Sequence, residues 1–195
     1  MVKLSDEQII ENRETAEKLL QQPFLDGGLL KQMFEQLDEF WTAPASSRED
    51  FHGAFPGGLC DHSLRVVRNL RKLAETLAPD RFLSERLDLL GLIHDLGKVG
   101  DGKRPLYVPN PNDWGRKRGF IYEINRDIPH MPISDRTIWL LQRHGVKFSA
   151  EEWLAVRLSD GQYEESNRRY AMREPDLALL LHFADRWACA EEKSL

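Results

Sequence analysis

The chain has 195 residues, with 27 Lys and Arg against 32 Asp and Glu, and therefore a formal net charge of -5. This length suits one domain, and a hydrophobic share of 41% is ordinary for a soluble globular protein. The mild acidity argues against a general nucleic-acid binder, and two cysteines are too few for a disulfide framework. No stretch is apolar for long enough to span a membrane, and the polar N-terminus lacks the apolar core of a signal peptide, so we expect a cytoplasmic protein.

Apolar residues recur at helical spacing along most of the chain. Two Ser-x-x-Gln/Glu patterns, at Ser5 and Ser149, are candidate capping boxes that mark helix starts. The predicted elements, in chain order, are a helix from Ser5, a helix over 29–41, a loop over 42–60, helices from Asp61 to Pro79 and over 81–95, an irregular segment over 96–133, and helices over 134–144, from Ser149 and from Pro175.

The irregular segment 96–133 contains five of the ten prolines, and we expect it to form at most a short hairpin between 107–108 and 120–122. The other segments predict an all-α fold, a single bundle of about six to eight helices. Residues 1–45 are expected to form an N-terminal helix pair that packs as an extension on a core of residues 46–195.

Four polar residues lie in apolar helical segments, namely His62, His94, Asp95 and Asp185. A lone histidine in such a helix is usually a core residue with a hydrogen-bond partner, whereas a buried carboxylate is rarer. Together, two imidazoles and two carboxylates suit a divalent metal of intermediate softness, such as Zn, Mn, Co or Fe. Adjacent helical residues point about 100° apart. We therefore expect His94 and Asp95 to share an ion only at the end or on the flank of their helix.

Three motifs carry a resemblance to a known family: His52-Gly-Ala-Phe-Pro-Gly-Gly-Leu-Cys-Asp-His62, then His94-Asp95-Leu-Gly-Lys98, then His182-Phe-Ala-Asp185-Arg. Their order and spacing resemble the HD-domain phosphohydrolase superfamily over about residues 50–190. The resemblance implies an HD domain over 46–195 and hydrolysis of phosphoester or phosphoanhydride bonds. It also implies a divalent metal (Zn, Mn, Co, Fe or Mg) held by His62, His94, Asp95 and Asp185.

Three further residues are candidates for catalysis. Lys98 would contact a phosphate, although a solvated lysine at a helix end is an equal alternative. His52 would face substrate or orient water, and His130 lies in the segment where two-metal relatives bind a second ion through extra histidines. Many relatives have histidine where this chain has Ser159-Asp160-Gly161, so we expect a single metal ion, with Asp160 as a possible substitute ligand.

Candidate substrate-binding residues are aromatic or cationic. Aromatic side chains could stack on a base, although the apolar stripe that ends at Trp41 favours a core position for that residue. Cationic side chains would neutralise a phosphate chain. The candidates are Trp41, Phe51, Lys117, Arg118 and Arg136.

The compact size and the arrangement of the motifs look like the small phage-encoded HD deoxynucleotide triphosphohydrolases, some of which remove dATP. That resemblance favours a dATP or dNTP triphosphohydrolase that releases nucleoside and triphosphate. We also expect a homo-oligomer in the cytoplasm (of the host, if phage-encoded), with neither a membrane nor a nucleic-acid polymer as partner. Because 195 residues leave room for the helical core and an N-terminal helix pair but not for a second recognition domain, the expected substrate is a small nucleotide. The alternatives are a 5′-nucleotidase or a 3′-5′ RNA exonuclease of the same superfamily, and a non-catalytic helical binding module with a structural metal.

Overall fold

The computed structural model describes residues 4–23 and 25–193. Within these ranges the chain forms eight α-helices, four short 3-10 helices and a two-stranded hairpin, which confirms the predicted all-α fold. The α-helices are α1 (Asp6–Leu20), α2 (Gly27–Gln36), α3 (Gly58–Leu77), α4 (Ser84–Ile93), α5 (Asp113–Lys117), α6 (Ile133–Arg143), α7 (Ala150–Arg157) and α8 (Asp176–Lys193). The 3-10 helices are η1 (Asp38–Trp41), η2 (Leu96–Val99), η3 (Gly161–Tyr163) and η4 (Glu165–Tyr170).

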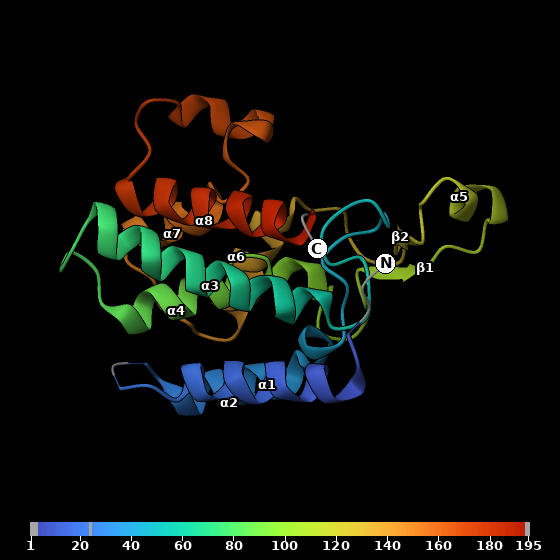
Figure 1. Ribbon diagram of the computed structural model, residues 1–195, viewed down its shortest axis with the longest axis horizontal. Coiled ribbons are helices and arrows are strands. Elements are labelled where there is room, and N and C mark those ends of the chain that lie inside the picture. The colour runs from blue at the N-terminus through green and yellow to red at the C-terminus, as the bar shows by residue number, and fades with distance from the viewer. Residues whose placement is uncertain (1–3, 24, 194–195) are drawn as a thin grey trace.

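Helix α3 lies at the centre of the molecule, between α8 on one side and α4 on the other (Figure 1). Helix α7 packs on α8, and α6 packs on η2 directly after α4. Helix α1 contacts both α3 and α4, so the two N-terminal helices cover the lower side of the bundle in Figure 1. The segment with β1 (Tyr107–Pro109), α5 and β2 (Tyr122–Ile124) projects from the bundle as an arm.

Both predicted capping boxes form. The Ser5 hydroxyl accepts from the Gln8 amide, the Gln8 side chain accepts from the Ser5 amide, and Ser149 and Glu152 make the same pair of bonds. Each box satisfies two backbone donors that a helix start otherwise leaves without a partner. These local bonds explain why the sequence located both helix starts correctly.

Several predicted boundaries differ from the structure, and the helix predicted over 81–95 is α4, Ser84–Ile93. The helix predicted over 29–41 is two pieces, α2 and η1, because the chain leaves the α-helical conformation at Leu37. Helix α3 begins at Gly58 rather than near Asp61, after Gly57 adopts a left-handed conformation with φ +80°. The second strand is 122–124 rather than 120–122, because Phe120 pairs instead with Arg48 in an isolated bridge.

The turn after α4 is held against α6 by a buried threonine. The Gly97 amide donates to Thr137 Oγ1 at 2.8 Å, and that hydroxyl donates to the His94 carbonyl at 3.2 Å. A Cβ atom on Gly97 would overlap the carbonyl oxygen of Ile133 at the start of α6. A residue without a side chain therefore lets α6 approach the end of α4 closely.

We expect Gly97→Ala to lower the free energy of unfolding by about 1 to 3 kcal/mol, because the added methyl group forces α6 away from η2. Chemical denaturation measures this change. Gly28→Ala is the matched control, since the nearest atom to a Cβ there is the Asp26 carboxylate oxygen at 3.7 Å. The control should be neutral or stabilising by up to about 1 kcal/mol. Equal stability of the two variants would contradict the close approach.

Candidate metal centre

The four polar residues singled out in the sequence meet at one point inside the bundle. His62 lies in α3, His94 directly follows α4 as its C-cap, Asp95 comes next, and Asp185 lies in α8. Asp95 has left the helical conformation, with φ -105° and ψ 15°. Its carboxylate can therefore turn toward the same cluster as the His94 ring, which is the arrangement expected at a helix end.

The distances among the donor atoms suit one cation. With ligand bonds of about 2.0 to 2.2 Å, neighbouring donors around a metal ion lie roughly 3 to 3.5 Å apart. The separations here are 3.0 Å for His62 Nε2 and Asp185 Oδ1, 3.4 Å for His94 Nε2 and Asp95 Oδ2, 3.8 Å for His62 Nε2 and Asp95 Oδ2, and 3.8 Å for His94 Nε2 and Asp185 Oδ1. Small movements of these side chains would complete a coordination shell.

Each histidine is oriented through its second ring nitrogen. His94 Nδ1 lies 2.8 Å from the Gly91 carbonyl, which can only accept, so the proton is on Nδ1. His94 Nε2 is buried without a hydrogen-bond partner among the described residues, and it is the ring atom that remains available to a metal ion. His62 Nδ1 lies 3.1 Å from Glu192 Oε1, an arrangement in which a carboxylate fixes the tautomer of a metal-binding histidine. Both rings present Nε2 to the carboxylates, and these donors fit a divalent cation.

The electrostatics of the cluster also favour a cation. Burial alone would raise the pKa of Asp95, but the Lys98 ammonium group, 2.6 Å away, and His94 outweigh it and lower that pKa. Burial would lower the pKa of His94, but the negative charges on Asp95 and on Asp185, whose Oδ1 lies 3.8 Å from His94 Nε2, raise it to about 10. Without a metal ion, protons on the histidines balance the two buried carboxylates. A divalent cation supplies that balance more completely.

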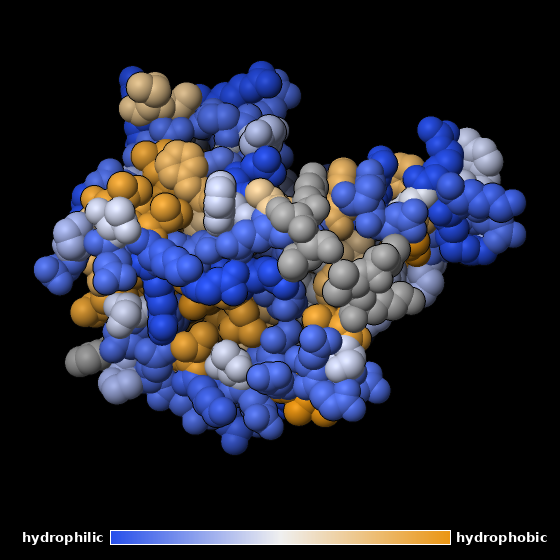
Figure 2. Space-filling view, in the orientation of Figure 1, coloured by the Kyte–Doolittle hydropathy of each residue, from blue (hydrophilic) through white to orange (hydrophobic). Residues whose placement is uncertain are grey.

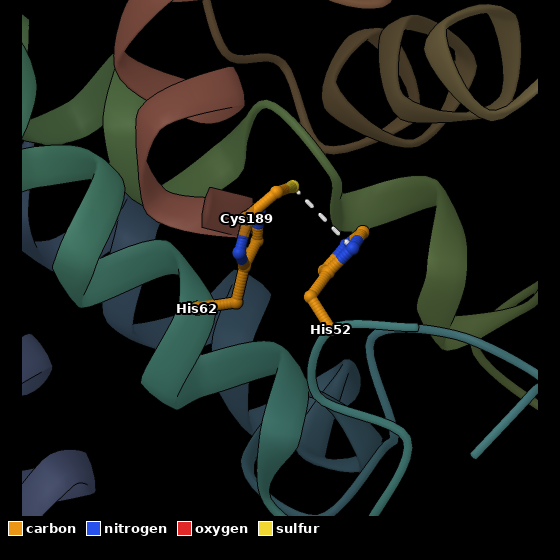
Figure 3. A group of neighbouring side chains, drawn as sticks. All are labelled: His52, His62 and Cys189. Carbon is orange, nitrogen blue, oxygen red and sulfur yellow. Dashed lines mark hydrogen bonds between the residues drawn. The ribbon is translucent and has the colours of Figure 1, made fainter. Parts of the chain in front are cut away.

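His52 joins the cluster from the loop before α3. Its ring centroid lies 4.5 Å from that of His62, and its Nδ1 lies 3.3 Å from Cys189 Sγ (Figure 3). Burial and the nearby Lys98 charge lower the pKa of His52 to about 2, so its imidazole is neutral at ordinary pH. Lys98 and His52, both expected from the sequence to be catalytic, therefore lie at the cluster.

A cavity of about 400 Å³ opens beside the cluster and is lined by Tyr107, His130, Arg136 and Asp160, among others. Asp160 is exposed at this cavity, and the negative charges on Asp95 and Asp185 raise the pKa of its carboxyl group. Arg136 is only 2% exposed, and its Nη2 donates to the Pro129 carbonyl at 2.7 Å. His130 is exposed at the rim of this cavity.

The remaining substrate-binding candidates lie elsewhere. Trp41 packs among core aromatics, 5.1 Å from Phe40 between ring centroids, and its exposed edge lines a different cavity between α1 and α2. The prediction that Trp41 is a core residue is therefore confirmed, and the structure gives no support to the alternative that Trp41 stacks on a base. Phe51 is 49% exposed beside the Arg48 guanidinium, and Lys117 and Arg118 are exposed at α5 on the arm.

Two residues of the cluster were missed in the sequence, Cys189 and Glu192. Both lie on α8, four and seven residues after Asp185, and these spacings place all three on one face of a helix. The spacing of Cys189 and Glu192 from Asp185 was therefore visible in the sequence. Acidic residues at such spacings are also common at exposed helix ends, so the spacing alone did not identify them. Only the packing of α8 against α3 shows that this face points inward.

These observations define an all-α protein with a His/Asp cluster between three helices that could hold a metal ion. The model of the HD domain family matches residues 59–188, and the chain belongs to this family. The family consists mostly of metal-dependent hydrolases, and membership supports metal-dependent phosphohydrolase activity in general. Comparison with curated proteins and with solved structures gave no match. In the described part of the chain, no helix is both long and apolar enough to cross a membrane.

Glu192→Ala should weaken binding of Zn²⁺ or Mn²⁺ about 10- to 100-fold, because His62 loses the carboxylate that orients its ring. Isothermal titration calorimetry on the metal-free protein measures this change. Glu191→Ala is the matched control, since Glu191 pairs instead with Arg68 and Asn69. Equal affinities of the two variants would show that Glu192 does not support the metal centre.

Proposed function

We propose that this protein hydrolyses a purine deoxynucleotide in a metal-dependent reaction, with dATP as the favoured substrate and nucleoside and triphosphate as products. The observation that carries the hydrolase is the convergence of two histidine Nε2 atoms on the carboxylates of Asp95 and Asp185, with a lysine ammonium group beside them. The preference for dATP rests on the resemblance in size and arrangement to the small HD deoxynucleotide triphosphohydrolases.

His62, His94, Asp95 and Asp185 would hold the cation. When bound, a divalent cation lowers the pKa of a water molecule and polarises a phosphoryl oxygen. Glu192 and the Gly91 carbonyl keep the two imidazoles in the ligating orientation. Lys98 presents an ammonium group next to Asp95, where it can pair with a phosphate oxygen as the substrate enters.

The cavity beside the cluster suits a small nucleotide in its size and its lining. About 400 Å³ lies within the usual range for small-molecule sites. Two tyrosines line it, Tyr107 and Tyr163, and their rings replace Trp41 as the candidates for stacking on a base. Asp160 also lines this cavity, where its carboxyl group could exchange a proton with a departing oxygen.

The arm supports a second candidate, hydrolysis at the end of an RNA strand. A cavity of about 800 Å³ runs along the arm and shares Ile124 and His130 with the smaller cavity. It is lined by Trp114, which is 65% exposed and carries the Arg118 guanidinium 4.5 Å from its ring centroid. Exposed aromatic rings with arginines are typical of surfaces that bind single-stranded nucleic acid.

A product analysis separates these candidates. The metal-free protein is mixed with Mn²⁺, Co²⁺, Mg²⁺ or Zn²⁺ and with dATP, other nucleotides or a short RNA, and the products are resolved by chromatography. Inorganic triphosphate identifies the proposed reaction, inorganic phosphate a 5′-nucleotidase, and mononucleotides an exonuclease. No turnover of any substrate with any of these metals would rule out the hydrolase and favour a structural metal.

His94→Ala and Asp95→Ala should each abolish metal binding and lower turnover at least about a hundredfold, because each removes a direct ligand. Helical content, measured by circular dichroism, should stay unchanged. His144→Ala is the control, since His144 ends α6 and belongs to neither group of candidate ligands. Wild-type turnover in both ligand variants would show that the cluster is not the reaction centre.

A further inference from the structure

A second group of donor atoms lies directly beside the metal centre. His52, His62 and Cys189 place ligand atoms within 4.8 Å of one another, and Figure 3 shows the His52 ring and the Cys189 thiol facing each other. Cys189 is only 7% exposed. Its sulfur also lies 3.7 Å from Asp185 Oδ1, the oxygen that contacts His62.

We propose that His52, Cys189 and Asp185 bind a second divalent cation, of the softer kind such as Zn²⁺ or Co²⁺, next to the first. The sequence predicted a single ion, because the histidines by which two-metal relatives bind a second ion are missing after α7. His52 lies in the loop before α3 and Cys189 in α8, and both fall outside residues 59–188.

The distances fit such a site. For a tetrahedral ion with a sulfur ligand at about 2.3 Å and a nitrogen or oxygen ligand at about 2.0 to 2.2 Å, the two donors lie roughly 3.6 Å apart. The observed separations are 3.3 Å from Cys189 Sγ to His52 Nδ1 and 3.7 Å from the same sulfur to Asp185 Oδ1. Three protein ligands leave one position for water or a phosphate oxygen, as in reactive rather than purely structural sites.

The protonation states of the ligands fit a second ion. Ligation by His52 Nδ1 would put the ring proton on Nε2. Binding also removes the thiol proton of Cys189, which passes to solvent, because only the thiolate ligates. A thiolate favours Zn²⁺ or Co²⁺ over Mg²⁺, so Cys189 would select the ion.

Cobalt binding tests the second site directly. The metal-free protein is saturated with Co²⁺, excess ion is removed, metal per chain is measured by mass spectrometry, and the near-ultraviolet spectrum is recorded. Wild-type protein should hold about two ions per chain. It should also show the thiolate-to-cobalt charge-transfer absorption. Cys189→Ala and His52→Asn should each hold about one ion, and Cys189→Ala should lose that absorption.

Cys60→Ala is the matched control, because Cys60 is also buried in a helix and belongs to neither ligand group. It should keep both ions and the absorption. Circular dichroism checks that each variant is folded, and His52→Asn tests the site without changing α8. One ion in the wild type, or the same absorption in Cys189→Ala, would overturn the proposal.

The second site rests on the proposed function only for its role, which is to neutralise further charge on a phosphate chain. The outcomes are therefore separable. One bound ion with nucleotide turnover rejects the second site and keeps the hydrolase. Two bound ions without turnover of any nucleotide keep the second site and reject the hydrolase.

Discussion

The arrangement of this protein depends on the electrostatic compensation of two carboxylates inside a helical bundle. Asp95 is 6% exposed, and Asp185 faces the same buried histidines. Removing a carboxylate from water costs several kcal/mol unless a cation and hydrogen bonds replace the lost hydration. Lys98 and the two imidazoles supply part of this compensation, and a bound divalent cation would supply the rest. The residues that position these side chains must therefore keep the carboxylates close to the lysine and the imidazoles.

The backbone satisfies that constraint through close helix contacts. A Cβ atom on Gly91 would lie 2.9 Å from backbone atoms of Val67, so α4 approaches α3 within a distance that a side chain would not allow. Thr137 then fixes the turn after His94 through two hydrogen bonds from α6. The histidines and carboxylates come from different helices, and this close packing sets their mutual distances. A ligand set built on packed helices is more rigid than one built on loops.

The features that the sequence predicted correctly are those that depend on local hydrogen bonds and on helical periodicity. The capping boxes at Ser5 and Ser149 involve bonds within one turn, so their position follows from residue types alone. The break at Leu37 depends on tertiary packing, which local propensity does not encode. The same holds for the cluster. His94 and Asp95 form a motif, but the contact between His52 and Cys189 joins residues 137 positions apart. The role of Glu192 likewise became visible only once α8 was placed against α3.

The charges around the centre indicate an order of binding. Four carboxyl groups lie in this region, those of Asp95, Asp160, Asp185 and Glu192. Among the described residues, Lys98 is the only lysine or arginine that forms an ion pair with a carboxylate of the cluster. An anionic substrate would meet repulsion there in the absence of a metal ion. A bound divalent cation reverses the local balance and attracts phosphate oxygens. A chain with a net charge of -5 can thus be suited to an anionic substrate, provided that cation binding comes first.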